Sequence, residues 1–578
     1  MGWSRALAGY AGTALLAAAL LWPILRLNRA DLRIPFLYEH DALAVHTLVK
    51  SLIDVGWCTQ NPYLGTPHGL DFRDYPIPDL LHMLALKLIA QATGDWALTC
   101  NLYYLLSFPL TALTAVWVIR QLGLPWPLAT AGAVMYAFLP YHLLRGQAHL
   151  FLAAYFLVPI ACWLLIRLDQ ETTSPPAWTY AFCLILPTAG VYYAFFTFSL
   201  LLVVAGRRVV ATGRLRASVA PLLLAGAVAL GTLAACLPTL LYRLREGDNP
   251  EAIVRFPVEA EIYGLKLVQL LMPLSGHRWW FLRHLKDAYN SSMPINESDC
   301  ATLGMVGSLG FLVLLGRVLL RRPTGDRSAL LDTLATLVLA AFLLATVGGV
   351  GTLVNYWLTP YIRAYNRISV FIAFYSILAV LIVIDGWSRH VAWLGSRPSL
   401  TWAVSLVLVG LAVLDQTSRR CAPSYKRVRE EFASDAGLVA EIERQLPRGA
   451  KVFQLPYQPF PEAGLLHALG SYDLLRGYLH SRELRWSFGA YRGRAGDQWQ
   501  RSLKNLPAAE LVRRLRAAGF AGIYLDRRGF ADGGAQLESD LGRILGTTPL
   551  VSANRRQVFY PFPADWPDTL PTAMVGRQ

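Results

Sequence analysis

The chain has 578 residues, of which 54% are hydrophobic and only 16% are charged. Soluble globular proteins carry about 25% charged residues, so this composition excludes an ordinary soluble enzyme and indicates burial in lipid. The net charge of +15 would also fit nucleic-acid binding. We reject that class of partner, because much of the arginine lies in short loops between apolar segments, where it is typical of membrane topology.

Apolar segments long enough to cross a membrane recur along the chain. A membrane helix needs about 20 apolar residues. The first segment ends in Trp22 and Pro23 rather than in the small residues of a cleavage site, so we interpret it as an uncleaved span. The candidate spans are 6–27, 98–119, 127–144, 149–166, 219–242, 301–319, 329–349, 368–385 and 400–415. The sequence therefore predicts a polytopic α-helical membrane protein.

Two further apolar runs need separate interpretation. The run 178–205 is interrupted by Pro187–Tyr193, and both of its flanks look cytoplasmic. Because a single span cannot begin and end on the same face, we predict two short helices folded as a hairpin, which brings the total to about eleven spans. The run 79–93 is short and contains His82 and Lys87. We predict that it lies on the membrane surface without crossing.

Short basic loops indicate the orientation. Arginines cluster in segments 206–218 and 317–328, which places these loops and the N-terminus in the cytoplasm. Three long polar segments, 28–97, 243–300 and 416–578, then share the opposite face. We expect a multi-pass protein of a bacterial inner membrane.

The composition changes after Asp415, where charges become dense and apolar runs shorten. The stretches "AKVFQLPY" and "FAGIYLD" are typical of buried strands, and "AAELVRRLRAAG" is typical of an amphipathic helix. We therefore predict a transmembrane domain over 1–415 and a soluble extracytoplasmic α/β domain over 416–578.

The seven cysteines include no CxxC pair of the kind that binds zinc. Cys58 and Cys300 fall in the predicted outer loops. A disulfide between them is an open alternative to two free thiols.

Acidic residues are dense directly after the first span. The stretch "YEHD" contains Glu39 and Asp41, and Asp71 and Asp74 follow in the same outer segment. A carboxylate at a membrane surface can act as a general base on an acceptor hydroxyl, and two carboxylates can hold a divalent cation. The alternative for Asp41 is a cap on the helix predicted after it. No ligand set is complete, so the metal is left open.

This layout resembles the GT-C superfamily of membrane glycosyltransferases. The features that carry the resemblance are the acid after the first span, the proline-led apolar helix in "RDYPIPDLLHMLALKLIAQATGDWALTCNLYYLL" and the C-terminal outer domain. The resemblance implies a polyprenyl-phosphate-linked sugar donor. It makes Asp41 the candidate catalytic acid, with Glu39 as the competitor because "EHD" departs from a DxD motif.

The implied donor brings a phosphate, for which arginine is the natural clamp. Arg145 and His149 are four residues apart, as are Arg363 and Arg367. If the segments are helical, each pair shares a face at the outer end of a span. We predict that these four residues bind the donor phosphate. The alternative is ordinary snorkelling at the membrane interface.

The loop 243–300 supplies further candidates. His277 and Arg278 precede Trp279 and Trp280, which fits either a phosphate site beside a sugar-stacking platform or an interfacial aromatic belt. The full set of substrate-binding candidates is Asp71, Asp74, Glu261, His277, Arg278, Glu297 and Asp299.

The resemblance implies an inverting glycosyltransferase that moves a sugar to a glycan, lipid or protein acceptor outside the cytoplasm. A transporter or flippase of lipid-linked sugars is one alternative, but the charges crowd the outer loops rather than the middle of the spans, and no repeat is visible. A non-catalytic assembly protein of the same fold is the other alternative, against which the clustered outer acids argue.

Overall fold

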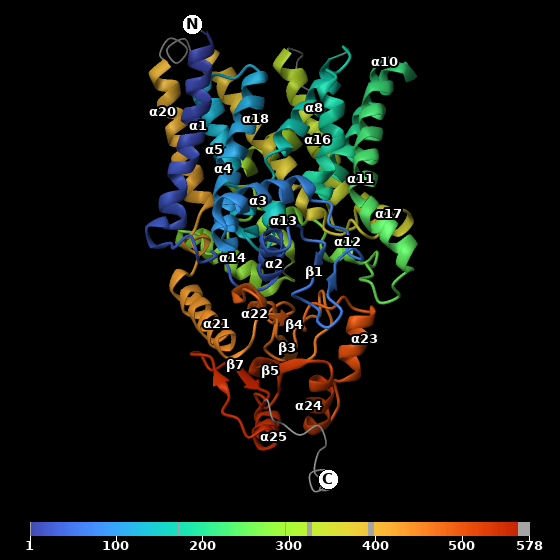
Figure 1. Ribbon diagram of the computed structural model, residues 1–578. Helices are drawn as coiled ribbons and strands as arrows, with labels where there is room; N and C mark the ends of the chain where they lie inside the picture. Colours follow the sequence, from blue (N-terminus) through green and yellow to red (C-terminus); the bar gives the residue numbers. More distant parts are fainter. Residues whose placement is uncertain (1, 172, 295, 321–325, 391–397, 564–578) are drawn as a thin grey trace.

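The computed structural model describes residues 2–171, 173–294, 296–320, 326–390 and 398–563. Long helices form a bundle in the upper part of Figure 1, and a small sheet with its helices lies at the opposite end. Short elements fill the level between them. They are α2 (Asp41–Asp54), α12 (Glu259–Ile262), α13 (Leu267–Leu271), α14 (Trp280–Ser292) and α17 (Val350–Trp357).

Seven of the described helices are long and apolar enough to cross a membrane. They are α1 (Gly2–Leu25), α4 (Trp96–Gln121), α10 (Val191–Thr212), α11 (Val219–Glu246), α16 (Asp326–Ala345), α18 (Ser369–His390) and α20 (Pro398–Gln416). In the most apolar stretch of α18, 89% of the residues are buried inside the protein, so this helix forms the centre of the bundle. The predicted class of integral membrane protein is confirmed.

Shorter apolar helices pack among these seven. They are α5 (Trp126–Ala137), α8 (Val158–Gln170), α9 (Trp178–Ile185) and α15 (Gly304–Leu319). The total of eleven spans stays a prediction.

Two predicted spans differ in detail. The segment 127–144 breaks into α5 and α6 (Pro140–Arg145), and 149–166 breaks into α7 (Leu150–Ala153) and α8. Pro140 begins α6, and Pro159 lies in the first turn of α8. Proline lacks a backbone N–H and is tolerated in a first helical turn, so each proline begins a new helix instead of continuing the old one.

The hairpin predicted over 178–205 forms, but only one of its helices is short. The helix α9 is extended by a 3-10 turn over Leu186–Ala189. The chain then reverses at Gly190, whose φ of 130° is readily adopted only by glycine. The second helix, α10, runs on to Thr212, so Arg207 and Arg208 are helical rather than in a loop.

The run 79–93 forms α3 (Leu80–Thr93), a helix of 14 residues. At a rise of about 1.5 Å per residue it is too short for a hydrocarbon core about 30 Å thick. In Figure 1 it lies at the lower end of the bundle, where it packs against α2 and α4. Its length and place fit the interfacial position that the sequence predicts.

Arginines at the upper end of the bundle pair with carboxylates. Arg207 of α10 pairs with Asp169 at 3.1 Å, and Arg317 of α15 pairs with Asp332 at 2.6 Å. Two other arginines of the predicted cytoplasmic loop 317–328, Arg321 and Arg322, lie outside the described residues. The orientation in the membrane stays a prediction.

The C-terminal part is a mixed α/β unit. Its five strands have the order β4-β3-β5-β7-β6, with β3 parallel to β4 and β5, and with β7 antiparallel to β5 and β6. The strands are β3 (Lys451–Leu455), β4 (Arg485–Trp486), β5 (Phe520–Asp526), β6 (Leu550–Val551) and β7 (Gln557–Pro561). The helices are α21 (Tyr425–Gln445), α22 (Leu475–His480), α23 (Ala495–Ser502), α24 (Ala508–Ala517) and α25 (Ala535–Leu545). Both predicted strands and the predicted amphipathic helix are confirmed.

Ion pairs join the three predicted outer segments to one another. In 28–97, the buried Asp74 receives two guanidinium bonds from Arg494, at 2.7 and 2.8 Å. In 243–300, Arg255 donates to both oxygens of Glu462, at 2.9 and 2.7 Å. The sheet unit is therefore fixed against the membrane end of the bundle.

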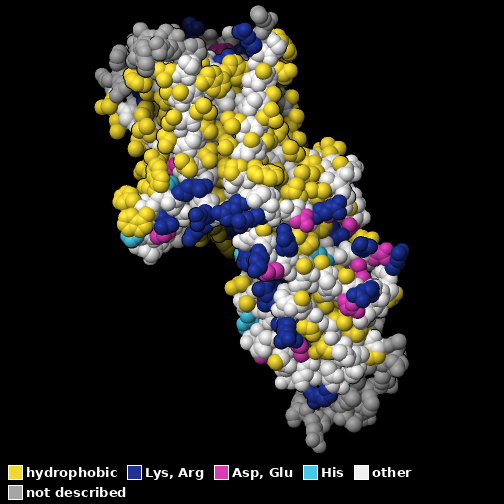
Figure 2. Space-filling model, turned by 90° about the vertical axis from the view of Figure 1, so that its left-hand side faces the viewer, with side chains coloured by type: hydrophobic (Ala, Val, Ile, Leu, Met, Phe, Trp, Pro, Cys, Tyr) yellow, Lys and Arg dark blue, Asp and Glu magenta, His cyan; other side chains and the backbone are white. Residues whose placement is uncertain are grey.

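The surface changes character at this junction. Figure 2 shows hydrophobic side chains over the bundle, a band of basic side chains at its lower edge, and mixed charges over the sheet unit. The segments after α1 and α20 supply exposed basic residues at this level, namely Arg29, Arg33, Arg419, Arg420, Lys426 and Arg429. Such a band is expected where an apolar belt meets lipid headgroups.

The cysteine pairing left open by the sequence does not form. Cys58 and Cys300 are both buried and both free. The disulfide alternative is wrong, and the Cys300 thiol donates instead to the backbone carbonyl of Glu297 at 3.0 Å.

Candidate active site

Asp41 is the first residue of α2, directly after the first long helix and its connecting segment. The cap position is held by His40, whose φ is 54°, and the cap makes no side-chain hydrogen bond. The capping alternative for Asp41 is therefore wrong. Its carboxylate lies at the positive end of the helix dipole, which stabilises a negative charge, and its side chain is 57% exposed.

His149 lies beside Asp41, with 3.8 Å between the imidazole Nε2 and the carboxylate Oδ2. Burial, together with the positive charges of Arg145 and Arg367, lowers the pKa of His149 to about 3. This imidazole is therefore neutral at physiological pH. The pKa of Asp41 is shifted the other way. Partial burial and the negative charges of Glu462 and Glu297 raise it.

Two buried arginines share one carboxylate next to this pair. Arg145 ends α6, and Arg367 lies in the 3-10 turn Tyr365–Ile368. Their guanidinium groups approach Glu297 at 2.9 and 3.6 Å. Burial alone would raise the pKa of Glu297, but the two arginines lower it to about 2. Glu297 is therefore ionised.

Each guanidinium also faces an aromatic ring. Arg367 lies 4.2 Å above the ring centre of Tyr192, and Arg145 lies 5.3 Å from that of Tyr141. Arg145 also donates to Asn366 at 3.2 Å. The Nε groups of both arginines are buried without a hydrogen-bond partner among the described residues. The site thus holds two buried N–H donors that have no acceptor among the described residues.

Arg363 stands at the edge of this group. It pairs with Glu259 at 2.5 Å and lies 5.0 Å from the ring centre of Tyr263. Its positive charge still reaches Asp41, whose pKa it lowers in part. Of the four predicted phosphate-binding residues, Arg145, His149 and Arg367 gather around Glu297, and Arg363 has a carboxylate of its own.

The helical spacing behind two of these predictions is wrong. Gly146 ends α6 directly after Arg145, so His149 precedes α7 and is not on the same helix face as Arg145. Arg363 precedes the 3-10 turn that carries Arg367. Tertiary contacts, rather than one helix face, bring the charges together.

The structure adds two acids that sequence reasoning missed. Asp79 occupies the cap position of α3, where burial raises its pKa to about 7 while the nearby Arg367 opposes the shift. Glu462 comes from the turn after β3 and adds negative charge near Asp41. An acid at the start of the helix in "YPIPDLL" was a usable signal for Asp79. Glu462 follows the predicted strand "AKVFQLPY" by several residues, and nothing in the sequence around it indicated a place near Asp41.

Several predicted acids lie elsewhere and have structural partners. Glu39 pairs with Arg427 of α21 at 2.9 Å, so Asp41 is the better placed of the two catalytic candidates. Asp71 pairs with its neighbour Arg73, and Asp74 pairs with Arg494. These carboxylates shape the first outer segment and fix it to the sheet unit.

The remaining candidates also make internal contacts. Glu261 accepts hydrogen bonds from the Gly348 N–H and the Thr352 hydroxyl. Asp299 pairs with Lys286 at 2.8 Å.

His277 and Arg278 both contact the end of α20. The fully buried His277 lies 3.3 Å from Asp415, and Arg278 donates to Thr417. Of the loop 243–300 candidates, only Glu297 joins the site around Asp41.

The donor set does not match a preformed metal centre. Within the described parts of the chain, no three side chains of His, Cys, Asp or Glu gather closely enough to hold an ion. We therefore derive no step through a divalent cation.

A family model described as a domain of unknown function, DUF6311, matches residues 76–394. The chain belongs to the DUF6311 family. The match covers the bundle from α3 to the end of α18, including Arg145, Glu297 and Arg367. A search of curated proteins found no match.

Solved structures extend the comparison over the whole DUF6311 chain. ArnT from Cupriavidus metallidurans, in a crystal structure bound to undecaprenyl phosphate, aligns with a TM-score of 0.53 at 13% identity, over 98% of this chain and 99% of that one. The mycobacterial arabinofuranosyltransferase AftD aligns at 0.47 and 14% identity, over 90% of this chain and 35% of its own. The Archaeoglobus fulgidus oligosaccharyltransferase AglB, in complex with an inhibitory peptide and a dolichol-phosphate, aligns at 0.44 and 13% identity, over 97% and 75%. The likeness to ArnT shows that the two proteins share a fold, and the predicted GT-C-like fold is confirmed.

Proposed function

We propose that this protein is a glycosyltransferase that uses a polyprenyl-phosphate-linked sugar as its donor. The observation that carries the proposal is the gathering of Asp41 and His149 beside two buried arginines that share one carboxylate. The GT-C fold supports it, because ArnT, which has this fold, binds undecaprenyl phosphate. A buried cation pair next to a carboxylate of raised pKa combines an anion site with a general base.

The donor phosphate would bind to Arg145 and Arg367. Their unpaired Nε groups and planar guanidinium forks suit a phosphate, which accepts paired hydrogen bonds. Glu297 holds both groups in place before the donor arrives. The tyrosine rings under the guanidinium groups keep water away from them.

Asp41 would act as the general base. Its carboxylate takes the proton of an acceptor hydroxyl, and the acceptor oxygen forms a bond to the anomeric carbon. The bond from that carbon to the phosphate oxygen breaks, and its electron pair leaves with the phosphate, which the arginines stabilise. A single displacement of this kind inverts the anomeric configuration. A raised pKa places Asp41 closer to the operating pH than an ordinary aspartate.

The site would lie at the extracytoplasmic surface of the membrane, with the sheet unit on the same side. The arginine-rich segments at the opposite end of the bundle support this orientation. We expect a reporter that is active only in the cytoplasm to be silent when it is fused to the C-terminus. Activity of that reporter would reverse the orientation.

The direct test is binding of undecaprenyl phosphate to the purified protein, followed by sugar transfer from a panel of undecaprenyl-phosphate-linked sugars. We expect the Arg145→Ala/Arg367→Ala double variant to lose binding. The matched control is Arg207→Ala at the other end of the bundle, which should bind like wild type. Equal binding by the double variant would refute the phosphate site, and binding without transfer of any sugar would favour a transporter.

A further inference from the structure

The sheet unit contains a cavity that the proposed active site does not use. It lies at the carboxyl end of β3 and beside the segment that follows β5, with a volume of about 410 Å³. Ligand pockets in proteins commonly measure about 300–1,000 Å³. The cavity is therefore large enough for a small molecule or one or two residues of a peptide.

The strand order explains why a cavity forms at this place. β3 lies between β4 and β5, and the chain passes from β3 to β4 on one side before it crosses to β5 on the other. The order reverses between β3 and β5, so their outgoing connections separate and leave a crevice. Ligands of open α/β sheets bind at such switch points, outside the carboxyl ends of the strands.

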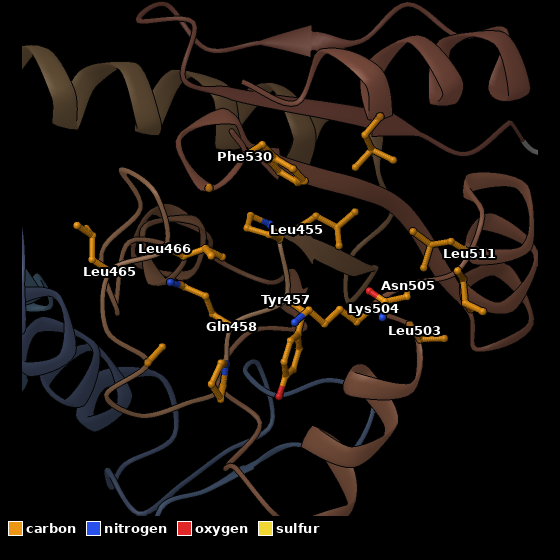
Figure 3. Close-up of a pocket in the computed structure, with 16 residues that line it drawn as sticks. Leu455, Tyr457, Gln458, Leu465, Leu466, Leu503, Lys504, Asn505, Leu511 and Phe530 are labelled. Atoms are coloured by element: carbon orange, nitrogen blue, oxygen red, sulfur yellow. The ribbon is translucent and has the colours of Figure 1, made fainter. Parts of the chain in front are cut away.

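The walls of the cavity are mainly aliphatic. Figure 3 shows leucines on opposite sides of the space and Phe530 above it. The main apolar contributors are Leu455, Leu466, Leu503, Leu511, Phe530 and Leu537. Sugar sites favour flat aromatic faces, whereas this shape and chemistry fit a branched aliphatic group.

One buried polar residue, Gln458, is part of the lining of this apolar space. Gln458 is only 4% exposed, and neither its carboxamide nitrogen nor its oxygen has a hydrogen-bond partner among the described residues. Buried polar groups are rarely left unpaired, because their desolvation is then uncompensated. A donor and an acceptor side by side are matched by a single amide group of a ligand.

Across the cavity from Gln458, Lys504 and Asn505 form part of the rim. Both are exposed, and no contact of the described residues pairs the Lys504 ammonium with a carboxylate. Tyr457 also lines the cavity, but its hydroxyl already donates a hydrogen bond to Asp497 and accepts one from Arg501. Lys504 is thus the cation that a ligand can reach.

We propose that this cavity binds a peptide-like ligand, with an amide for Gln458, an aliphatic side chain for the leucines and a carboxylate for Lys504. The smallest probe with all three groups is N-acetyl-L-leucine. The proposal stands independently of the glycosyltransferase reaction, since none of its residues belongs to the site around Asp41.

The test is ligand-observed NMR with the full-length protein in detergent, using N-acetyl-L-leucine at up to about 10 mM, since a fragment of this size binds in the millimolar range. N-Acetyl-L-leucinamide, which lacks the carboxylate, and N-acetylglycine, which lacks the aliphatic side chain, should each bind less tightly. N-Acetyl-D-glucosamine should not compete. Absence of N-acetyl-L-leucine binding, or tighter binding of the sugar, would overturn the proposal.

Variants locate the binding. Gln458→Leu places an apolar group in apolar surroundings, so it should fold and weaken the probe about tenfold, as expected for loss of a buried hydrogen-bonding group. The matched control is Gln445→Leu on the exposed end of α21, which should change nothing. Lys504→Gln should reduce the affinity for N-acetyl-L-leucine to that for the amide. If Gln458→Leu and Gln445→Leu both bind like wild type, the probe binds elsewhere and the proposal fails.

Discussion

Two ion-pair sites at opposite ends of the helical bundle bury opposite members of the pair. At the end that carries the start of α1, Asp169 is 5% exposed, whereas its partner Arg207 is 34% exposed. At the end that faces the sheet unit, Arg145 is 5% exposed and Arg367 is 10% exposed, whereas their shared partner Glu297 is 27% exposed. The Asp169 site buries its carboxylate, whereas the Glu297 site buries its guanidinium groups.

This difference separates an anchor from a binding site. A buried carboxylate with an exposed arginine neutralises a helix end and leaves positive charge facing solvent. Two buried arginines around one partly exposed carboxylate are the arrangement that the proposed anion site requires, because buried charges must stay paired. Arg317 is also more buried than its partner Asp332, but it is a single guanidinium that also donates to the Ser328 hydroxyl.

The largest expected effect is the loss of transfer in Asp41→Asn. The swap keeps the size of the side chain but removes the base, and loss of a general base typically costs about 10²- to 10⁴-fold in rate. Folding should be unchanged, since the side chain is exposed and makes no capping bond. Transfer rate and thermal melting of the purified protein measure the two effects.

Glu39→Gln is the matched control for that variant. Glu39 pairs with Arg427 in an exposed ion pair, and such pairs contribute about 0–1 kcal/mol. Its transfer rate should stay within a few-fold of wild type. A slow Glu39→Gln protein beside an active Asp41→Asn protein would exchange the two roles.

The next effect in size concerns the arginines, and it contrasts the two ends directly. Lysine keeps the charge but loses the bidentate fork, so Arg145→Lys or Arg367→Lys should weaken binding of undecaprenyl phosphate about 10- to 100-fold, the worth of a hydrogen bond to a charged group. Arg207→Lys should bind normally, because its exposed head needs only a positive charge. Equal behaviour of all three variants in a binding titration would remove the distinction between the ends.

Sequence reasoning found part of this site and missed the rest for a physical reason. Asp41 was a candidate because it comes directly after the first span, and the structure places it beside His149; its catalytic role stays a prediction. Arg145, His149 and Arg367 were predicted from helical spacing. Arg145 and His149 are not on one helix, however, and tertiary packing brings their side chains together. Glu297 was one acid among several in its loop, and nothing local distinguished it from Asp299.

The fold shows the same division between local and long-range information. Apolar length predicted the long helices, and short apolar runs typical of buried strands predicted β3 and β5. The breaks at Pro140 and Pro159 come from the prolines themselves, but a prediction based on apolar length alone continues through them. Glu462 reaches the site from a different segment because the sheet unit is fixed to the first outer segment by the Asp74–Arg494 pair.

A smaller effect should appear in the pH profile. Burial and nearby negative charge raise the pKa of Asp41, so kcat/KM should fall as the pH drops through a value above the ordinary aspartate pKa of about 4, by up to about tenfold per pH unit. Glu462→Gln removes one of the negative charges, so the acid limb should move to lower pH. A limb that stays in place in Glu462→Gln would show that another group sets it.

The smallest expected effect is the sharpest comparison of the two ends. Glu297→Gln keeps the shape of the carboxylate but removes the charge that competes with phosphate for Arg145 and Arg367. Undecaprenyl phosphate should therefore bind about two- to fivefold more tightly, a change of less than about 1 kcal/mol, because the lost competition is partly offset by looser arginines.

Asp169→Asn is the counterpart at the other end. It removes a buried carboxylate from Arg207, whose exposed head can turn to water, so the melting temperature should fall while phosphate binding stays constant. Both are measured on the same purified proteins by thermal melting and lipid titration. Weaker phosphate binding by Glu297→Gln would contradict this. Glu297 would then position Arg145 and Arg367 for the phosphate and would not compete with it.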